Sequence, residues 1–313
     1  MDSKNRKLAE IAYMYYIDGL SQNQIAKKIG ISRSMVSTLL SEARDSGIVK
    51  IEVRDADLYC FDIQRELENI FGIEKIMVIP NLSSKEDNIY GQLADVCVDY
   101  LGQIIENNMV IGISWGRTMY EIAHRIRSDG KKNITISPLV GGVGNEINSY
   151  HSNVISELMA NNLGANSLGL YAPVFVSSKE VRDVILNDKH IKKVLDTSKN
   201  ADIAIVGVGA IEYSTMRDIG TLEEEDVIKL KSSGVVGDIN TMFFDESGDL
   251  ADPEFTNRTI AITIEELKRI EKIIAVAGGI KKANAIHAAL KGKLMDVLIT
   301  DEEVAKSILA QYK

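Results

Sequence analysis

The 313-residue sequence has no apolar run that reaches the roughly 18 residues required for a membrane-spanning helix. Its first residues lead into an amphipathic helical pattern and not into a signal-peptide core. Cysteine is scarce, because only Cys60 and Cys97 are present, far apart and without histidine or cysteine at ligand spacing. These absences argue against a membrane protein, a disulfide framework and a zinc site. We therefore expect a cytoplasmic protein with two buried free thiols and no metal.

The composition, with 45% hydrophobic and 26% charged residues, is that of a soluble globular protein. Its length allows one large α/β domain with a small module, or two ordinary domains. The net charge of -9 is spread unevenly: residues 1–55 carry nine lysines or arginines against seven acids, a charge of +2, which leaves -11 for the remainder. A weakly basic head on an acidic body permits DNA binding by the head, although the charge alone is a weak argument.

Three helices are predicted in the first 55 residues. Residues 7–18 place apolar side chains at helical spacing. A capping-box pattern, Ser21 with Gln24, starts a short second helix. After a turn that contains glycine, Ser32 can cap a third helix with one apolar face and one face of short polar side chains. This succession is typical of a helix-turn-helix, and the alternation in residues 47–54 predicts a small β-wing after it.

The polar face of the third predicted helix suits a DNA major groove, because short side chains and an arginine can reach base edges there. The front of the second helix is placed for phosphate contact. A three-helix unit could instead be a protein-interaction module, and Lys27 with Lys28 could be only a solvated face. Turn length, capping and polar face together favour double-stranded DNA as the partner. The predicted DNA-binding residues are Gln22, Gln24, Lys27, Ser32, Arg33, Ser34, Ser37 and Thr38.

Residues 55–72 predict a helix that connects the head to the body. The sequence shows no low-complexity linker and no internal repeat, so the two parts are expected to be coupled and not loosely tethered. We predict a helix-turn-helix DNA-binding domain over residues 1–55 and a domain for effector binding and oligomerisation over residues 56–313.

The body alternates short apolar strands with helical stretches, a pattern that indicates an α/β fold, a doubly wound and mostly parallel sheet with helices on both faces. Ligands of such sheets bind beyond the C-terminal ends of the strands, where the loops meet. The predicted strands are Lys75–Ile79, Val110–Ile113, Ile134–Leu139, Ser167–Leu170, Ile203–Gly207, Val235–Asp238, Ile273–Ala277 and Val297–Thr300.

The stretch Ile111–Thr118 is predicted to turn from a strand into a helix. Its two glycines allow a tight turn and a close approach to a bound group, and the free N–H groups of the new helix favour an anion. Ser114, Arg117 and Thr118 can add donors. The alternative is an ordinary capped turn between strand and helix. The stretch lacks the lysine of a P-loop and the spacing of a dinucleotide fingerprint, so the anion is not identified by this turn alone.

Four further strand ends offer glycine, amide, hydroxyl, carboxylate or cationic groups, which together suit a small phosphorylated sugar or polyol. Each group also has a structural explanation, as a turn glycine, a cap, a core histidine or a solvated lysine. The stretch Gly207–Glu212 lacks the third glycine of a dinucleotide site, so no cofactor is expected. The predicted effector-binding residues are Gly112, Ser114, Gly116, Arg117, Thr118, Gly141, Gly142, His151, Asn153, Gly209, Arg217, Asp238 and Lys282.

Over essentially its full length the sequence resembles the SorC/DeoR family of bacterial sugar-responsive transcription regulators. The resemblance implies an effector domain similar to sugar-phosphate isomerases and coenzyme A transferases, without retained catalysis. It also implies tetramers, as dimers of dimers, that bind an operator beside a sugar-catabolism operon. The stretches that carry the resemblance are Leu20–Ala26, Gly112–Thr118, Pro138–Gly142, Gly237–Ile239, Val276–Gly279 with Lys282–Ala283, and Asp296–Asp301.

Within that family the turn from Ser114 to Thr118 would hold a phosphate, and Lys282 would reach the ligand from the other side. His151 and Asn153 fall where family members place polar ligand contacts. Some relatives have a lysine or an arginine just before the double glycine, where this chain has Val140. The resemblance therefore implies that an imine cannot form at that position and that a second phosphate loses a partner there.

We interpret the sequence as a non-enzymatic, effector-gated DNA-binding regulator, in which a sugar phosphate shifts the population of arrangements of the DNA-binding heads. The main alternative is an enzyme of the sugar-phosphate isomerase or deaminase class with an appended helix-turn-helix. That alternative needs a carboxylate base, for which Asp238 is the candidate. A third possibility is a metabolite sensor whose helical head binds protein.

Overall fold

The computed structural model describes residues 3–50, 60–80, 89–143, 149–213, 216 and 220–312. Contacts between residues divide the chain into two compact units, Met1–Asp55 and Ala56–Lys313. In the described part of the chain, no helix combines the length and the hydropathy needed to cross a membrane.

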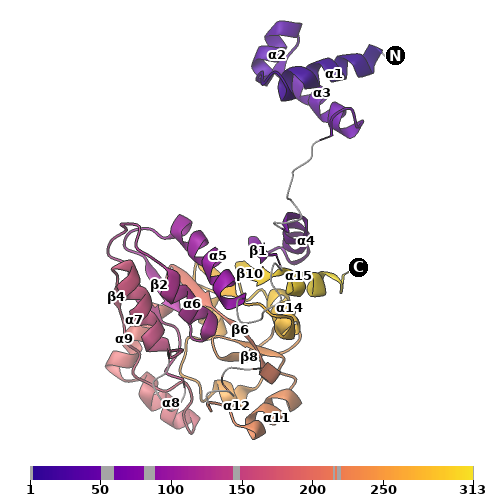
Figure 1. The fold of residues 1–313 in the computed structure, drawn as a ribbon. Helices are drawn as coiled ribbons and strands as arrows, with labels where there is room; N and C mark the ends of the chain where they lie inside the picture. The colour runs from indigo at the N-terminus through magenta and orange to yellow at the C-terminus, as the bar shows by residue number, and fades with distance from the viewer. Residues whose placement is uncertain are drawn as a thin grey trace. The chain divides into compact units, whose positions relative to one another are not determined.

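The N-terminal unit consists of the three predicted helices, α1 (Ser3–Tyr16), α2 (Gln22–Ile29) and α3 (Arg33–Asp45), as Figure 1 shows. Apolar residues from all three helices form its core, and among them Ile11, Ile25 and Val36 are fully buried. The predicted wing is not a strand in residues 47–50, and its remaining residues, 51–54, lie outside the described part. The helix-turn-helix itself is confirmed.

The predicted caps fix the two turns of this unit. Ser21 accepts a hydrogen bond from the backbone N–H of Gln24, whose side-chain oxygen accepts the N–H of Ser21 at 2.9 Å. Gly30 then ends α2 in the left-handed conformation at a φ of 75°, which glycine adopts without steric cost. Ser32 caps α3 by accepting from the N–H of Met35 at 3.1 Å. The second helix therefore begins and ends, and the third helix begins, where the sequence predicted.

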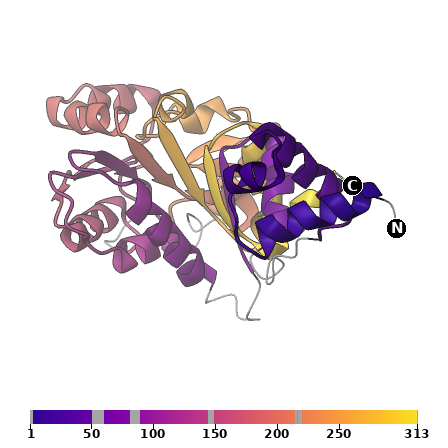
Figure 2. The same ribbon diagram turned by 90° about the horizontal axis from the view of Figure 1, so that it is seen from above.

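The C-terminal unit is built on a seven-stranded parallel sheet with the order β1-β10-β9-β5-β2-β3-β4, which confirms the predicted fold class. From β2, the chain extends the sheet in one direction through β3 and β4 and then in the other direction through β5, β9 and β10, so helices cover both faces, as Figures 1 and 2 show. The strands are β1 (Lys75–Ile79), β2 (Val110–Ile113), β3 (Thr135–Pro138), β4 (Asn166–Ser167), β5 (Ile203–Val206), β9 (Lys272–Val276) and β10 (Val297–Asp301).

Side chains alternate between two hydrophobic cores along the strands. In β5, Ile203 and Ile205 point into one core, while Ala204 and Val206 point into the other. The first core lies beneath α5 (Ile89–Ile104), α6 (Arg117–Arg125) and α7 (Ser152–Leu163), and the second beneath α4 (Phe61–Phe71), α14 (Ala283–Lys291) and α15 (Glu302–Leu309). Strands buried on both faces explain the continuous apolar runs of the sequence.

A second, three-stranded antiparallel sheet in the order β6-β7-β8 lies beyond the parallel one. The prediction that Val235–Asp238 belongs to the parallel sheet is therefore wrong, because residues 237–239 form the central strand of this smaller sheet. Asn240 and Thr241 connect β7 to β8 with φ values of 49° and 65°, as a two-residue hairpin turn requires. The strands are β6 (Val208–Ala210), β7 (Gly237–Ile239) and β8 (Met242–Phe244).

The remaining elements are short and surround these layers. The helix predicted over residues 55–72 is described from Phe61 onward as α4, and residues 55–59 lie outside the described part. The strand predicted at Ser167–Leu170 overlaps the two-residue strand β4 (Asn166–Ser167) only at Ser167. The other helices are α8 (Lys179–Leu186), α9 (Lys189–Ser198), α11 (Glu224–Ser232), α12 (Pro253–Thr256) and α13 (Ile264–Leu267), with 3-10 turns η2 (Ile211–Tyr213) and η3 (Ile280–Lys282).

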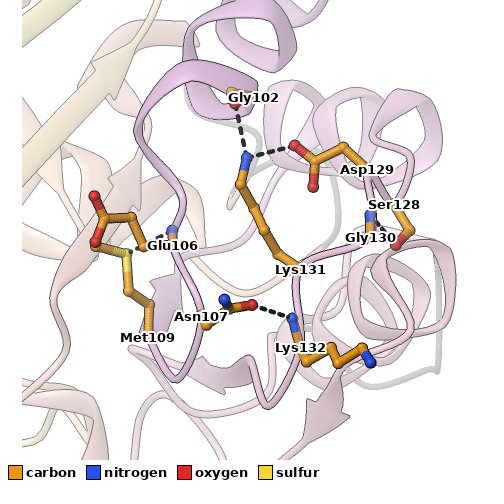
Figure 3. A network of polar contacts seen from close by, with 9 residues as sticks. All are labelled: Gly102, Glu106, Asn107, Met109, Ser128, Asp129, Gly130, Lys131 and Lys132. Atoms are coloured by element: carbon orange, nitrogen blue, oxygen red, sulfur yellow. Dashed lines mark hydrogen bonds and ion pairs between the residues drawn. The ribbon is translucent and has the colours of Figure 1, made fainter.

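Polar contacts join the two loops that enter β2 and β3 at the N-terminal edge of the sheet (Figure 3). Lys131 donates to the carbonyl of Gly102 at 3.0 Å and pairs with Asp129. The side-chain oxygen of Asn107 accepts the N–H of Lys132 at 2.7 Å. Since ligands of parallel sheets bind at the opposite edge, we assign this network to stability.

Candidate effector pocket and DNA interface

The turn after β2 presents an open helix N-terminus. The N–H of Ser114 continues the sheet by donating to the carbonyl of Ile205 at 3.0 Å. Gly116 then starts α6 at a φ of 110°, a conformation that side chains other than glycine rarely adopt. In the described structure no side chain caps α6. The first N–H groups of this helix, with their partial positive charge, are therefore available to an anion.

A pocket lies at this turn, at the C-terminal ends of β2 and β5, where the sequence predicted it. It brings together Ser114, Gly116, Arg117, Thr118, Gly209, Asp238 and Lys282 from the predicted effector-binding residues. Its other lining residues are Tyr90, Trp115, Met119, Gly207, Val208, Tyr213, Met216 and Asn240.

Asp238 and Lys282 both line this pocket, and each affects the pKa of the other. Burial raises the pKa of Asp238 from 3.8 to about 6, although Lys282 and the N–H of Thr241 act in the opposite direction. Burial lowers the pKa of Lys282, which Asp238 raises and Arg117 lowers further. Both charged forms are therefore destabilised by their surroundings. An anion beside Lys282 and a hydroxyl donor beside Asp238 would each relieve part of that cost.

Gly209 is required for the placement of Asp238. The two residues are paired across β6 and β7, and a side-chain carbon added at Gly209 would lie 2.1 Å from Oδ1 of Asp238. The other carboxylate oxygen, Oδ2, accepts the N–H of Thr241 at 3.3 Å. Glycine at this position therefore lets the carboxylate lie across the strand and face the pocket.

Five predicted effector residues do not line this pocket and have other contacts. A side chain at Gly112 would meet Leu139 at 2.3 Å, and one at Gly141 would meet two backbone oxygens at 2.7 Å. The ring of His151 packs against Gly142, and its Nδ1 caps α7 by accepting from Asn153 at 3.2 Å.

Asn153 bonds through its side chain to both backbone groups of Leu170, at 2.9 and 3.2 Å. Its amide therefore holds the chain that follows β4. The remaining predicted effector residue, Arg217, lies outside the described residues. The roles of His151, Asn153 and Arg217 in ligand binding stay predictions.

Asn240 and Trp115 line the pocket, but neither was predicted from the sequence to bind the effector. Asn240 lies in the turn between β7 and β8, and the two turn residues, Asn240 and Thr241, include no glycine that would have marked the turn. The indole N–H of Trp115 donates to Oγ1 of Thr241 at 3.0 Å. Trp115 lies within the stretch Ile111–Thr118, which was predicted to bind an anion, so its place in the pocket could have been predicted from the sequence.

The predicted DNA-binding face of α3 is exposed: Arg33, Ser34, Ser37 and Thr38 all face solvent. Met35, with 50% of its surface exposed, lies one helical turn before Thr38 and was not predicted. An exposed apolar side chain there suits contact with a thymine methyl group.

Some of the predicted polar groups in this unit are already engaged. The hydroxyl of Ser32 caps α3 and also contacts the hydroxyl of Ser34 at 2.9 Å, and that of Thr38 donates to the carbonyl of Ser34 at 3.1 Å. The side-chain oxygen of Gln24 belongs to the capping box. Arg33 keeps its full set of donors for base edges, so we expect it to contribute most to base preference.

We predict that Arg33→Ala lowers operator affinity about 5- to 150-fold and relaxes base preference, since one bidentate base contact is worth about 1–3 kcal/mol. Lys27→Ala is the matched control, because the loss of a phosphate contact weakens binding to all sequences alike and reduces the salt dependence. Selection of bound sequences from a random DNA pool, followed by titrations at two salt concentrations, measures both effects. An unchanged affinity and footprint for Arg33→Ala would contradict the assignment.

Two family models match the chain and cover both units. The model described as "Putative sugar-binding domain" matches residues 58–310, and a model of sigma-70 region 4 matches residues 5–46. The deoxyribonucleoside regulator of Bacillus subtilis is 31% identical over 312 residues, which cover 99% of each chain. The transcriptional regulator LsrR of an Enterobacter species is 31% identical over 309 residues, or 97% of this chain and 92% of that one.

Solved structures agree with these matches. A DeoR family transcriptional regulator from Listeria monocytogenes is 34% identical with a TM-score of 0.74, covering 79% of this chain and 98% of that chain. The full-length sorbitol operon regulator SorC from Klebsiella pneumoniae is 26% identical with a TM-score of 0.75, covering 98% and 100%. The chain is therefore a sugar-binding transcriptional regulator and belongs to the SorC/DeoR family.

Proposed function

We propose that the pocket between the turn after β2 and η3 binds a small phosphorylated sugar or polyol without forming a covalent bond. The observation that carries this proposal is the uncapped N-terminus of α6, with Lys282 lining the same pocket. The helix N–H groups, the Thr118 hydroxyl and Arg117 can donate to phosphate oxygens, and Lys282 adds a positive charge with little water around it. Four kinds of donor around one small pocket suit a dianionic group.

The other side of the pocket suits hydroxyl groups. Asp238 presents a carboxylate whose Oδ1 has no backbone donor in the described structure, so it can accept from a ligand hydroxyl. A ligand that carries both a phosphate and hydroxyl groups would therefore use both sides. This combination supports a phosphorylated sugar or polyol over an inorganic anion.

The effector would act on DNA binding by shifting the population between different arrangements of the C-terminal units. We infer that it stabilises one arrangement of the C-terminal units, which changes how the heads are spaced against operator half-sites. The assembly proposed for this is a tetramer, a dimer of dimers, acting in the cytoplasm beside a carbohydrate-catabolism operon. Analytical ultracentrifugation with and without effector tests the assembly.

We predict that Thr118→Val reduces stabilisation by effectors. A ligand at about 100 times its Kd stabilises a protein by about 2.7 kcal/mol, which corresponds to several degrees in Tm. In a thermal-shift screen of sugars, polyols and their phosphates, a phosphorylated compound should raise the Tm of the wild type, and the shift should fall by at least half in Thr118→Val. Equal shifts in the two proteins, or stabilisation by unphosphorylated sugars alone, would contradict the proposed site.

Binding without turnover is part of the proposal. Asp238 is the one carboxylate among the described lining residues, and the relatives named above are regulators. A pKa of about 6 would nevertheless suit a general base in an isomerase. Incubation with pentose and hexose phosphates tests this point, because turnover that is lost in Asp238→Asn would favour an enzyme.

A further inference from the structure

The hydroxyl of Ser114 is already committed inside the protein. Its Oγ donates to Oδ1 of Asn240 at 3.0 Å, and both residues have only 2% of their surface exposed. Ser114 follows directly after β2, whereas Asn240 lies 126 positions later in the turn between β7 and β8. The bond therefore joins the parallel sheet to the antiparallel one at the wall of the pocket.

The direction of this bond is fixed by the other contacts of Asn240. Its Nδ2 faces two backbone carbonyl oxygens, those of Leu139 at 3.2 Å and Ile262 at 3.4 Å. An amide turned the other way would place its oxygen against these two acceptors, so Nδ2 must point at them and Oδ1 at Ser114. A serine hydroxyl has a single proton, and that of Ser114 is used in the hydrogen bond to Asn240.

We propose that Ser114 accepts a hydrogen bond from a hydroxyl of the effector and does not donate to its phosphate. This inference rests on the proposed function of the pocket and replaces the expectation that Ser114 adds a donor to the anion site. Redirecting the Ser114 proton to a phosphate would leave the buried Oδ1 of Asn240 without a donor, which is unfavourable for a group that water cannot reach. The phosphate has sufficient donors without it, in α6, Thr118, Arg117 and Lys282.

The pocket then has a donor side and an acceptor side. The acceptor side consists of Ser114 Oγ and the Asp238 carboxylate, which come from different sheets and line the same pocket. Two acceptors select a ligand that carries hydroxyl groups beyond its phosphate, whereas a phosphate whose oxygens are held on the donor side does not reach them. Ser114 is therefore a specificity-determining residue for the hydroxyl-bearing part of the effector.

The test compares two probes, inorganic phosphate and glycerol 3-phosphate, by calorimetric titration of the full-length protein. We expect Ser114→Ala to lower the affinity for glycerol 3-phosphate about 3- to 10-fold, the worth of one hydrogen bond, and to leave the affinity for phosphate unchanged. Thr118→Val should lower both affinities by a similar factor. Ser137→Ala is the control for a buried serine, since its bond to Ser198 at 2.8 Å lies outside the pocket lining, and it should change neither.

Each outcome decides one question. Equal losses for the two probes in Ser114→Ala would show that Ser114 donates to phosphate, and no loss for either would show that it does not touch the ligand. Both results overturn the inference while Thr118→Val still supports the phosphate site. If the wild type binds neither probe, or if Thr118→Val leaves both affinities unchanged, the proposed function fails and the inference with it. A melting curve for each variant confirms that it is folded during the titration.

Discussion

Lys282→Met is expected to abolish the response to a phosphorylated effector, with an affinity loss of at least about 100-fold. The ammonium is half-buried and lines the effector pocket with Arg117 and Asp238. Removing one partner of a desolvated charge pair costs about 2–5 kcal/mol, because the other charge is left without compensation. Methionine keeps a similar unbranched shape, so packing is preserved while the charge is lost.

Lys281→Met provides the matched control for this experiment. Lys281 is the neighbouring residue in the chain, but it is exposed, and its Nζ lies 5.0 Å above the ring of Tyr213. Its loss removes the same charge and should change effector affinity less than about 3-fold, as for a single exposed charge. Titration of effector against protein bound to a fluorescent operator measures both variants. Similar effects of the two substitutions would mean that general electrostatics, and not the pocket, holds the anion.

Asp238→Asn is expected to stabilise the folded protein at pH 8 by about 1–3 kcal/mol. Burial raises the pKa of Asp238 from 3.8 to about 6, a difference worth about 3 kcal/mol once the group is ionised. The folded state thus holds this proton more tightly than the unfolded state. The stability that comes from this tighter binding of the Asp238 proton is complete below about pH 4 and is lost as the pH rises through about 6. Loss of the attraction to Lys282 offsets part of the gain.

Urea unfolding of both proteins at pH 4 and pH 8 measures this effect. The difference in unfolding free energy should be near zero at pH 4 and should favour the asparagine variant at pH 8. Asp249→Asn, at an exposed position, controls for the loss of one negative charge from an acidic chain. A difference between wild type and Asp238→Asn that is the same at both pH values would contradict the assignment. The Asp238→Asn variant should also bind hydroxyl-bearing effectors less tightly, because an effector hydroxyl loses its charged acceptor. Asp238 would then be a residue that lowers stability and is retained for function.

Much of the site could be predicted from sequence because parallel strands place their C-terminal ends along one edge. Ser114, Gly209 and Lys282 lie far apart in the chain, yet each follows an apolar strand, and this rule alone brought them together. The hydrophobic core could also be predicted, because strands that are buried on both faces have apolar residues at successive positions. In the N-terminal unit, the capping serines Ser21 and Ser32 fixed the starts of α2 and α3 to within a residue.

The antiparallel sheet could not be predicted, for a physical reason. Strands β6 and β8 have three residues each, too few to show a period, and the turn between β7 and β8 uses Asn240 and Thr241 without a glycine. Residues that cap helices and residues that bind ligands are also of the same types. His151 and Asn153 fit both descriptions from sequence, and the structure adds the backbone contacts that each of them makes.

Trp115 has a consequence for observing this protein at work. It is the single tryptophan of the chain, it lines the effector pocket, and its indole N–H is held by Thr241 in the same turn that orients Asn240. Selective excitation of tryptophan therefore reports from one place only, with no contribution from the N-terminal unit or from DNA. The protein carries its own optical probe of pocket occupancy, and effector titrations in the presence of operator need no added label.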